Sequence, residues 1–405
     1  MPKNILVLTT IYPAPNIKIA NTTNVVHYFA REWVKKGYNV RVVFNYPIYL
    51  KVLHFISGFI KNTLASKFNT SVTSKYINEE IEYEIDGVKV ILMPLYKPLP
   101  RYKVPDKSLN NQIIRIVEYC NKNDFKPDII TSHNYYPHLP MVNRLKEYYF
   151  RDSKTCIVVH KQVWKMLQYC GKDYKKEIAK IDVWGYRSKP LKDEFEKNTG
   201  CIPENWFMCY SGIPAHFYDN NNKCDIHKPI NRFVYVGSFI RRKYPEKLLE
   251  AINICKLKDF RLDYIGDGSN RHIIECIINK NKWFDKVKLH GFVKREHVPD
   301  YIEKAQCFIM ISEEETFGLV YLEAMSKGCI TIASKNEGME GIIVDGKNGF
   351  LCKAGDENEL ASIINKINNM PQEQLNEISI NAIKTAKGLT DENAAEHYIN
   401  SILIS

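Results

Sequence analysis

The sequence predicts an α/β protein built from two doubly wound parallel sheets. Short apolar runs alternate with amphipathic helical stretches along the chain, as they do where helices connect parallel strands. The alternation stops near 200–230, where prolines, glycines and the polar run 219–223 are typical of a linker, and then restarts. A length of 405 residues agrees with two or three domains of roughly 150 residues each. The content of 45% hydrophobic and 25% charged residues excludes a disordered or low-complexity chain.

The first half predicts four strands and two helices. The strands are expected where short apolar runs occur, at 5–9, 40–44, 128–132 and 156–160. A helix is predicted over 22–37, with Gly37 as its stop, because apolar residues follow helical spacing at Val26, Phe29, Trp33 and Val34. A second helix is expected around 139–149.

The second half repeats the alternation. Its predicted strands are 233–237, 261–268, 287–292, 307–312 and 329–334, and a helix follows the first of them to about 255. The last segment, 392–403, predicts a helix with one apolar face, formed by Ala395, Tyr398, Ile399, Ile402 and Leu403.

These elements divide the chain into a domain at 1–206, a domain at 207–387 and a C-terminal helix at 388–405. We expect this helix to pack back toward the first domain. Open parallel sheets bind ligands at the carboxyl ends of their strands. A cleft between the two domains is therefore the expected site.

The charge is distributed unevenly. The chain carries 57 basic and 46 acidic side chains, a net charge of +11. Residues 1–190 hold 30 basic and 15 acidic side chains, or +15, and the remainder holds 27 and 31, or −4. The asymmetry predicts that the first half faces a polyanion, which is a membrane surface, a nucleic acid or a phosphorylated substrate.

Cysteine usage and hydropathy predict a cytoplasmic protein. The eleven cysteines are scattered and contain no C-x-x-C pair, which is typical of reduced thiols and does not favour a structural zinc site. Met1 leads directly into a short apolar strand, so we expect no signal peptide. The most apolar long stretch, 42–60, is interrupted by Pro47 and Lys51 and is not expected to span a membrane.

The most informative stretch runs from Ser312 to Met325. It predicts a strand end, an acidic loop and a helix that begins near Phe317. The N-terminus of such a helix suits a diphosphate, because it presents backbone N–H groups and a positive dipole. Glu315 lies just before this helix and Glu323 lies one to two turns inside it, and carboxylates accept hydrogen bonds from sugar and ribose hydroxyls. On spacing alone, a solvated acidic loop before an ordinary helix is the alternative.

The block from Glu315 to Glu323, written through TFGLVYLEAM, resembles the signature of glycosyltransferase family 4, the retaining nucleotide-sugar transferases with a GT-B fold. The likeness extends over nearly the whole chain, through ILVLTTIYP near the start, 233–252, YIGDGSNR (264–271), KLHGFV (288–293) and VDGKNGFL (344–351). The resemblance implies two Rossmann-like doubly wound domains that face each other across a cleft, the first for the acceptor and the second for the nucleotide sugar.

The resemblance also implies roles for individual residues. Glu315 would contact the hydroxyls of the donor sugar, Glu323 those of the ribose, and Lys243 would neutralise the departing phosphate as a catalytic cation. His160, at the end of a strand, would lie near the reacting sugar carbon. The remaining residues expected to bind the donor are Gly237, Ser238, Arg242, Gly266, Asp267, Gly268, Phe292, Val293, Thr316, Phe317, Gly318 and Leu319. Those expected to bind the acceptor are His133 and Asn21.

Three positions depart from the family pattern. The arginine of its Gly-Arg-Leu strand end is Ser238 here, so Arg241 or Arg242 would have to supply the second cation. The glycine pair of the first loop falls on Ala20 and Asn21. The usual glutamate of the later Gly-Gly-x-x-Glu segment is Gly341.

The stretch 48–68 predicts an amphipathic helix with a narrow basic face. Lys51, His54, Gly58 and Lys61 follow helical spacing among leucine, valine, phenylalanine and isoleucine. Such a helix is typical of an interfacial anchor on an anionic membrane. A helix packed on the domain's own sheet is the alternative.

The resulting hypothesis is a retaining hexosyltransferase that needs no cofactor or metal. It would move a sugar from a nucleoside diphosphate, UDP favoured over GDP, to a glycan or lipid-linked acceptor in cell-surface polysaccharide biosynthesis. It would act in the cytoplasm or at the inner face of the membrane. The alternatives are a nucleotide-sugar epimerase of the same fold, a non-catalytic glycosyltransferase homologue and a nucleic-acid-binding protein. The last is disfavoured, since the basic residues are dispersed and no RNA-binding signature or helix-turn-helix is present.

Overall fold

The computed structural model describes residues 3–15, 17, 24–50, 76–99, 102–160, 163–218 and 225–405. The chain forms two compact units. The first comprises Met1–Tyr186, Leu191–Cys209 and Ala394–Ser405, and the second comprises Arg187–Pro190 and Tyr210–Asn393. Each unit is built around its own sheet. The predicted α/β class, with two sheets of mostly parallel strands, is confirmed.

The sheet of the first unit has eight strands in the order β3-β4-β2-β1-β5-β6-β7-β8. Its strands are β1 (Asn4–Thr9), β2 (Asn39–Ile48), β3 (Ile81–Ile85), β4 (Val88–Tyr96), β5 (Ile129–His133), β6 (Lys154–Val159), β7 (Val183–Tyr186) and β8 (Trp206–Met208). Its helices are α1 (Val25–Lys35), α4 (Asp106–Lys122), α5 (His138–Tyr148), α6 (Val163–Cys170), α7 (Tyr174–Ala179), α8 (Lys189–Thr199) and α15 (Asp391–Ile404).

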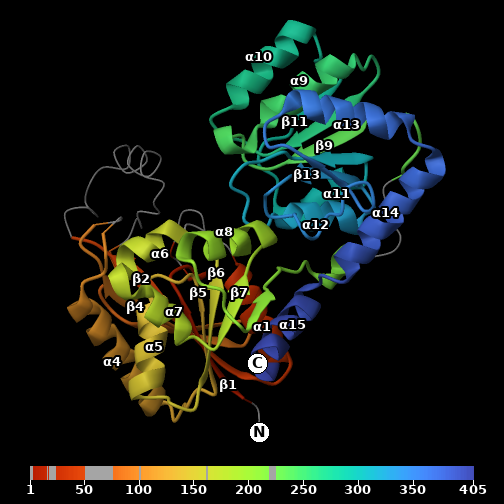
Figure 1. The fold of residues 1–405 in the computed structure, drawn as a ribbon. Helices are drawn as coiled ribbons and strands as arrows, with labels where there is room; N and C mark the ends of the chain where they lie inside the picture. Colours follow the sequence, from red (N-terminus) through yellow and green to blue (C-terminus); the bar gives the residue numbers. More distant parts are fainter. Residues whose placement is uncertain are drawn as a thin grey trace. The chain divides into compact units, whose positions relative to one another are not determined.

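Helices cover both faces of this sheet because its central strands are apolar on both sides. Along β1, Leu6 and Leu8 pack with α4 and α5, whereas Ile5 and Val7 pack with α1 and α15. Figure 1 shows α4, α5 and α7 on one face of the sheet. The C-terminal helix α15 is fixed to α1, since the indole N–H of Trp33 donates a 2.9 Å hydrogen bond to the carbonyl of Ala395.

One strand pair differs from the predicted parallel arrangement. β3 pairs antiparallel with β4, and Asp86 and Gly87 form the tight turn between them. Both turn residues have positive φ, 50° and 77°, as the two central residues of a type I′ hairpin require. The Asp-Gly dipeptide is a local hairpin signal, but this hairpin was not predicted.

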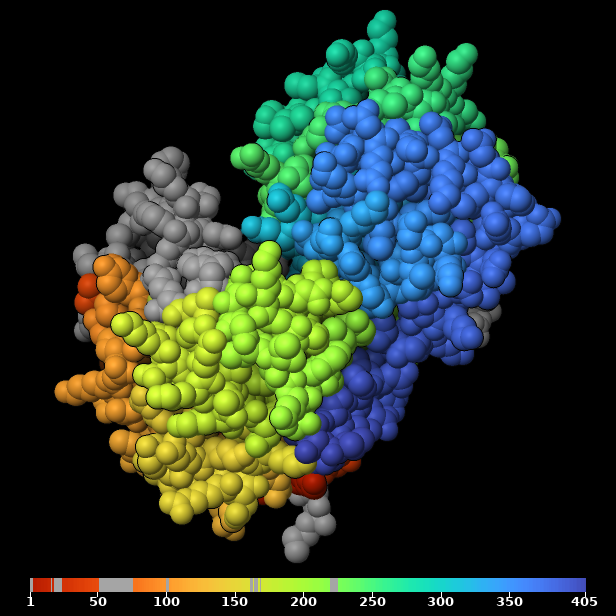
Figure 2. All heavy atoms as spheres, viewed as in Figure 1, coloured from red at the N-terminus to blue at the C-terminus, as the bar shows by residue number. Residues whose placement is uncertain are grey.

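The second sheet has six parallel strands in the order β11-β10-β9-β12-β13-β14. They are β9 (Arg232–Val236), β10 (Arg261–Ile265), β11 (Val287–Leu289), β12 (Cys307–Ile309), β13 (Ile330–Ser334) and β14 (Phe350–Cys352). Its helices are α9 (Pro245–Cys255), α10 (Arg271–Asn281), α11 (Val298–Ile302), α12 (Leu319–Ser326), α13 (Glu357–Asn369) and α14 (Gln372–Lys387). In the space-filling view, α13 and α14 form much of the visible surface of this unit (blue in Figure 2).

Two strands end earlier than predicted, where glycines of positive φ follow. The strand expected over 261–268 stops at Ile265, since Gly266 and Gly268 adopt φ of 136° and 157°. The strand expected over 287–292 stops at Leu289, two residues before Gly291, which has φ 71°. These early ends lengthen the loops at the carboxyl edge of the second sheet.

A buried histidine makes the stability of the first unit depend on pH. His138 lies in the core, where the Asn45 amide donates to Nε2 at 3.2 Å and Nδ1–H donates to the carbonyl of Asn134 at 3.1 Å. Burial lowers the pKa of His138 to about 4. The unfolded chain therefore binds a proton that the folded chain does not between pH 6.5 and 4, so stability is lost as pH falls through this window.

Through His138, the wild type should lose about 2 kcal/mol of its free energy of unfolding between pH 7.5 and pH 5. We expect His138→Gln to abolish this loss. Urea unfolding at both pH values, followed by tryptophan fluorescence, measures this difference, because four of the five tryptophans lie in the first unit. His397→Gln, on the exposed side of α15, is the control and should keep the wild-type pH response. An unchanged pH response in the His138 variant would contradict the expectation.

Candidate functional site

Three loops meet at the carboxyl edge of the second sheet. They follow β9, β12 and β13, which are neighbours in the sheet and run in the same direction. Parallel strands place the loops at their carboxyl ends side by side. The loops therefore bring together residues 237–243, 310–318 and 335–341, which are far apart in the sequence.

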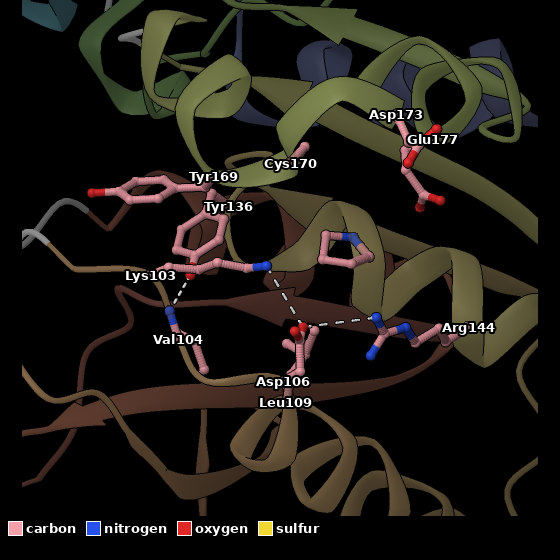
Figure 3. Close-up of a pocket in the computed structure, with 11 residues that line it drawn as sticks. Lys103, Val104, Asp106, Leu109, Tyr136, Arg144, Tyr169, Cys170, Asp173 and Glu177 are labelled. Carbon is pink, nitrogen blue, oxygen red and sulfur yellow. Dashed lines mark hydrogen bonds and ion pairs between the residues drawn. The ribbon is translucent and has the colours of Figure 1, made fainter.

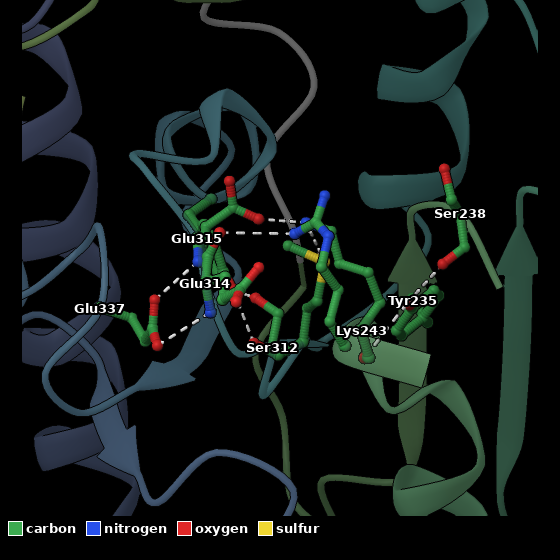
Figure 4. Close-up of polar contacts among 10 residues, drawn as sticks. Tyr235, Ser238, Lys243, Ser312, Glu314, Glu315 and Glu337 are labelled. Atoms are coloured by element: carbon green, nitrogen blue, oxygen red, sulfur yellow. Dashed lines mark hydrogen bonds and ion pairs between the residues drawn. The ribbon is translucent and has the colours of Figure 1, made fainter. Parts of the chain in front are cut away.

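Lys243 and Glu315 form an ion pair at the centre of these loops (Figure 4). Lys243 ends the 3₁₀ turn Arg241–Lys243, and Glu315 belongs to the loop after β12. Their side chains are only 12% and 14% exposed. The structure therefore brings together the predicted catalytic cation and the predicted sugar-binding carboxylate, and it shields both charges from most of the solvent.

The basic turn and the acidic loop are joined by further hydrogen bonds. The amide of Glu313 donates to the carbonyl of Arg242 at 2.7 Å, and the Arg242 guanidinium approaches the carbonyl of Glu314 at 3.5 Å. The hydroxyl of Tyr244 donates to the Glu313 carboxylate at 2.7 Å. Arg242 is thus beside the ion pair, whereas Arg241 is exposed.

Glu337, which the sequence analysis did not assign to the site, holds the acidic loop in place. Its carboxylate accepts the amide of Glu314 at 3.0 Å and the amide of Glu315 at 2.6 Å. The loop needs this support because Glu314 has the unusual φ of 54°. The residue after Glu337 must be glycine, since a Cβ at Gly338 would lie 2.5 Å from the backbone nitrogen of Phe317. Glu337 follows the end of β13 by three residues. A carboxylate so close to the carboxyl end of a strand is a sequence signal that could have predicted its place in the site.

We expect Glu337→Ala to lower turnover about tenfold while the binding of free nucleotide changes little, since two charge-assisted hydrogen bonds position Glu315. Glu337→Gln keeps one acceptor oxygen and should recover part of the loss. Glu340→Ala is the matched control, because Glu340 accepts the amide of Asn336 and not those of the acidic loop. Full turnover in the Glu337→Ala variant would show that the loop holds its conformation unaided.

The helix α12 begins directly after this loop, two residues later than predicted. Gly318 is its N-cap with φ 81°, and a Cβ there would lie 2.5 Å from the Tyr321 ring. Phe317 is buried under the Arg187 guanidinium, 5.0 Å from the ring centroid, and beside Tyr210. Thr316 and Leu319 flank this anchored segment and are half-buried. The first amides of α12 have no partner within the helix, so they can bind an anion.

Glu323 is held by an arginine that the sequence analysis missed. It lies in the second turn of α12, with a side chain only 5% exposed, and accepts bonds from Nε and Nη2 of Arg295 at 2.9 and 2.7 Å. Burial raises the pKa of Glu323, and Arg295 acts in the opposite direction. The pair keeps a buried carboxylate in a defined orientation beside the helix start. No local motif marks Arg295.

Gly266 and Gly268, two of the predicted donor-binding residues, lie in close contact with the backbone of another loop. A Cβ at Gly266 would lie 2.0 Å from the carbonyl oxygen of Gly237, and a Cβ at Gly268 would lie 2.5 Å from that of Phe239. The amide of Phe239 donates to the carbonyl of Asp267 at 2.9 Å. Contact between the loops after β9 and β10 thus accounts for the glycines without a ligand.

Two other predicted donor-binding residues lie next to Gly291. Phe292 is 85% exposed, and Val293 is half-buried against the core of the second unit. The ring of Phe292 therefore has a free face for a flat ligand.

His133 and His160 are neighbours in the first unit. Nδ1 of His133 and Nε2 of His160 are 2.8 Å apart, and the Tyr398 hydroxyl of α15 lies 3.5 Å from Nε2 of His133. His133 is only 1% exposed and stacks on Phe29, whereas His160 is half-buried. Acceptor contact by His133 stays a prediction. Asn21 lies outside the described residues, as does 51–68 of the predicted amphipathic helix.

Neither a metal-binding cluster nor a membrane-spanning helix occurs among the described residues. No group of three His, Cys, Asp or Glu side chains among them is arranged to hold a metal ion. In the same part of the chain, every helix is too short or too polar to cross a membrane.

Known glycosyltransferases are similar to this chain in sequence. Residues 219–385 match the sequence model of the family described as glycosyl transferases group 1. An uncharacterised glycosyltransferase of Methanocaldococcus jannaschii is 28% identical over 183 residues, which are 45% of this chain and 48% of that protein. The amylovoran biosynthesis glycosyltransferase AmsK of Erwinia amylovora is 22% identical over 81% of this chain and 83% of its own.

Solved structures show the same fold over the whole chain. HepE of Anabaena, solved in complex with UDP, has a TM-score of 0.67 at 15% identity and is covered completely, as is this chain. A lipopolysaccharide outer core galactosyltransferase, WaaB, has a TM-score of 0.68 at 14% identity, with 99% of both chains covered. The predicted pair of Rossmann-like domains is thus confirmed as a GT-B fold.

Proposed function

We propose that this chain, whose residues 219–385 match the model of the glycosyl transferases group 1, transfers a sugar from a nucleoside diphosphate to a glycan or lipid-linked acceptor. The observation that carries the proposal is the largely shielded ion pair of Lys243 and Glu315, in which Glu315 comes just before the N-terminus of α12. A cation, a carboxylate and a row of helix amides are the groups that a nucleotide sugar requires for its diphosphate and its hydroxyls.

The donor would lie across the carboxyl edge of the second sheet. The first amides of α12 and Lys243 would bind the diphosphate, with Arg242 as the second cation. Glu323, oriented by Arg295, would accept the ribose hydroxyls, and Glu315 those of the sugar. UDP is the favoured nucleotide, because HepE, which shares the fold, was solved with UDP.

The proposed reaction retains the configuration at the sugar carbon. The bond from that carbon to the phosphate oxygen breaks, the acceptor oxygen attacks from the same face, and the acceptor proton passes to the departing phosphate. The absence of a motif-placed carboxylate nucleophile supports this route over a covalent intermediate. Lys243 and the helix amides would stabilise the charge that grows on the phosphate, so we propose that no metal ion is required.

The acceptor belongs to the first unit in this proposal. Its net charge of +15 over residues 1–190 suits a phosphorylated or membrane-borne acceptor, and the name of AmsK connects that relative to polysaccharide biosynthesis. We propose that the protein acts at an anionic membrane surface. Co-sedimentation with vesicles should then require anionic lipid and weaken as salt screens the charges.

The test is a thermal-shift panel of UDP, GDP, ADP and CDP with their sugars, followed by product analysis. A nucleotide at 100 times its dissociation constant adds about 2.7 kcal/mol of stability, which raises the melting temperature measurably. We expect one nucleoside diphosphate to stabilise the protein. The corresponding nucleotide sugar should be hydrolysed slowly, and the released sugar should be the retained anomer. Stabilisation by none of them would refute the proposal, and conversion of a nucleotide sugar to its epimer would favour the epimerase.

A further inference from the structure

A pocket in the first unit lies outside the site described above. It has a volume of about 140 Å³ and is formed by the segment before α4, by Tyr136 after β5, by α5 and by the run from α6 to α7. Figure 3 shows its residues: Tyr136 and Tyr169 lie together with Lys103 beside them, and Asp106, Arg144, Asp173 and Glu177 lie around the rest of the pocket. A concave site with one apolar wall and a few converging polar groups is the usual form of a small-ligand pocket.

Two tyrosines form the apolar wall. The rings of Tyr136 and Tyr169 are stacked, with centroids 4.3 Å apart and planes inclined by 30°. The Tyr136 hydroxyl accepts the amide of Val104, which fixes the ring against the segment before α4. A rigid aromatic wall of this kind can pack against the C–H face of a sugar ring at little cost in side-chain entropy.

Charged side chains around the rest of the pocket are loosely paired. Lys103 Nζ lies 3.7 Å and Arg144 Nη2 lies 4.0 Å from Oδ1 of Asp106, beyond hydrogen-bond distance. A hydroxyl between such groups can bond to both, as a bridging water does. Asp173 and Glu177 add two carboxylates on the α6–α7 side of the pocket.

The balance of charges points to an uncharged, polyhydroxylated ligand. The three carboxylates of the pocket are matched by Lys103 and Arg144 in its lining and by Lys176 and Lys180, which pair with Asp173 at 3.3 Å and with Glu177 at 3.9 Å. Neither sign of charge dominates, so neither an anion nor a cation is favoured. Sugar hydroxyls both donate to carboxylates and accept from guanidinium and ammonium groups. We propose that this pocket binds one pyranose ring of a neutral saccharide. That the ring belongs to the acceptor rests on the proposed function.

Saturation-transfer NMR on the full chain tests the pocket directly, with methyl glycosides of glucose, galactose and N-acetylglucosamine as probes. The variant combines Arg144→Met with Asp173→Asn, whose partly or largely exposed side chains can change without opening the core. The matched control combines Arg151→Met with Asp152→Asn, also in the first unit and outside the pocket. We expect at least one glycoside to bind the wild type and the control, and the pocket variant to bind it about tenfold or more weakly.

Three results would overturn the proposal. The first is that the wild type shows no saturation transfer to any of the glycosides. The second is that the pocket variant shows as much saturation transfer as the wild type. The third is that the control variant loses glycoside binding as much as the pocket variant does. Thermal shifts with UDP on the same samples separate this proposal from the proposed function, because the pocket variant should respond to UDP as the wild type does. If no nucleotide binds but glycoside binding still depends on the pocket, the sugar site stands and its assignment to the acceptor fails.

Discussion

Glu315→Gln and Lys243→Met are each expected to lower turnover about a hundredfold or more. Removing one preorganised electrostatic partner of a developing charge costs about 3 kcal/mol in the transition state. The two side chains contact each other and are mostly buried, so each variant also removes one charge of a shielded ion pair. Sugar transfer by the purified variants, compared at saturating donor, measures the effect. The double variant should lose less than the two single losses multiplied together, because the residues act as a unit.

The controls for this experiment lie in the same unit. Glu314→Gln changes the neighbouring, exposed carboxylate, and Lys258→Met removes an exposed lysine far along the chain from the turn. Both should keep turnover within a factor of two or so, as surface substitutions usually do. Transfer at the wild-type rate by either Glu315→Gln or Lys243→Met would remove that residue from the catalytic site.

Glu323→Gln is expected to weaken the binding of free nucleoside diphosphate about ten- to a hundredfold. A carboxylate that accepts ribose hydroxyls forms charge-assisted bonds, each stabilising the complex by about 1.5–3 kcal/mol. Glu315→Gln should leave the free nucleotide unaffected and weaken only the sugar-bearing donor. Calorimetric titration of both variants with the nucleotide and with its sugar separates the two roles.

Arg295→Met provides a second test of the ribose site. Burial raises the pKa of Glu323 and Arg295 lowers it, so without the arginine the carboxyl should hold its proton to higher pH. Nucleotide binding by this variant should therefore improve as pH rises, whereas wild-type binding should depend less on pH. Free nucleotide that binds normally to Glu323→Gln and weakly to Glu315→Gln would mean that the two roles are reversed.

Much of the fold was predictable because its signals are local. Each strand of the second sheet up to β13 coincides with a short apolar run, and α15 with the apolar face at 392–403. The first strand and the helix after it were found in the same way. The hairpin of β3 and β4 was missed, although its Asp-Gly turn is also a local signal.

The core of the candidate site was predictable for the same reason. Glu315, Gly318 and Glu323 belong to one contiguous block of sequence. They therefore lie in one loop and in the helix that follows it, whatever the arrangement of the other elements. Lys243 was placed by a second block after a neighbouring strand. That it meets Glu315 follows from the pairing of β9 with β12, which sequence spacing does not encode.

Only the tertiary structure decided which residues hold these groups in place. Arg295 reaches Glu323 across 28 residues, Glu337 reaches Glu315 across 22, and Tyr398 of α15 meets His133 across 265. The sequence by itself determined the alternation of strands and helices and the acidic block, since both depend on the order of residues within one element. The supporting contacts depend on strand order and on loop conformation, because hydrogen bonds between side chains form only once separate elements have packed.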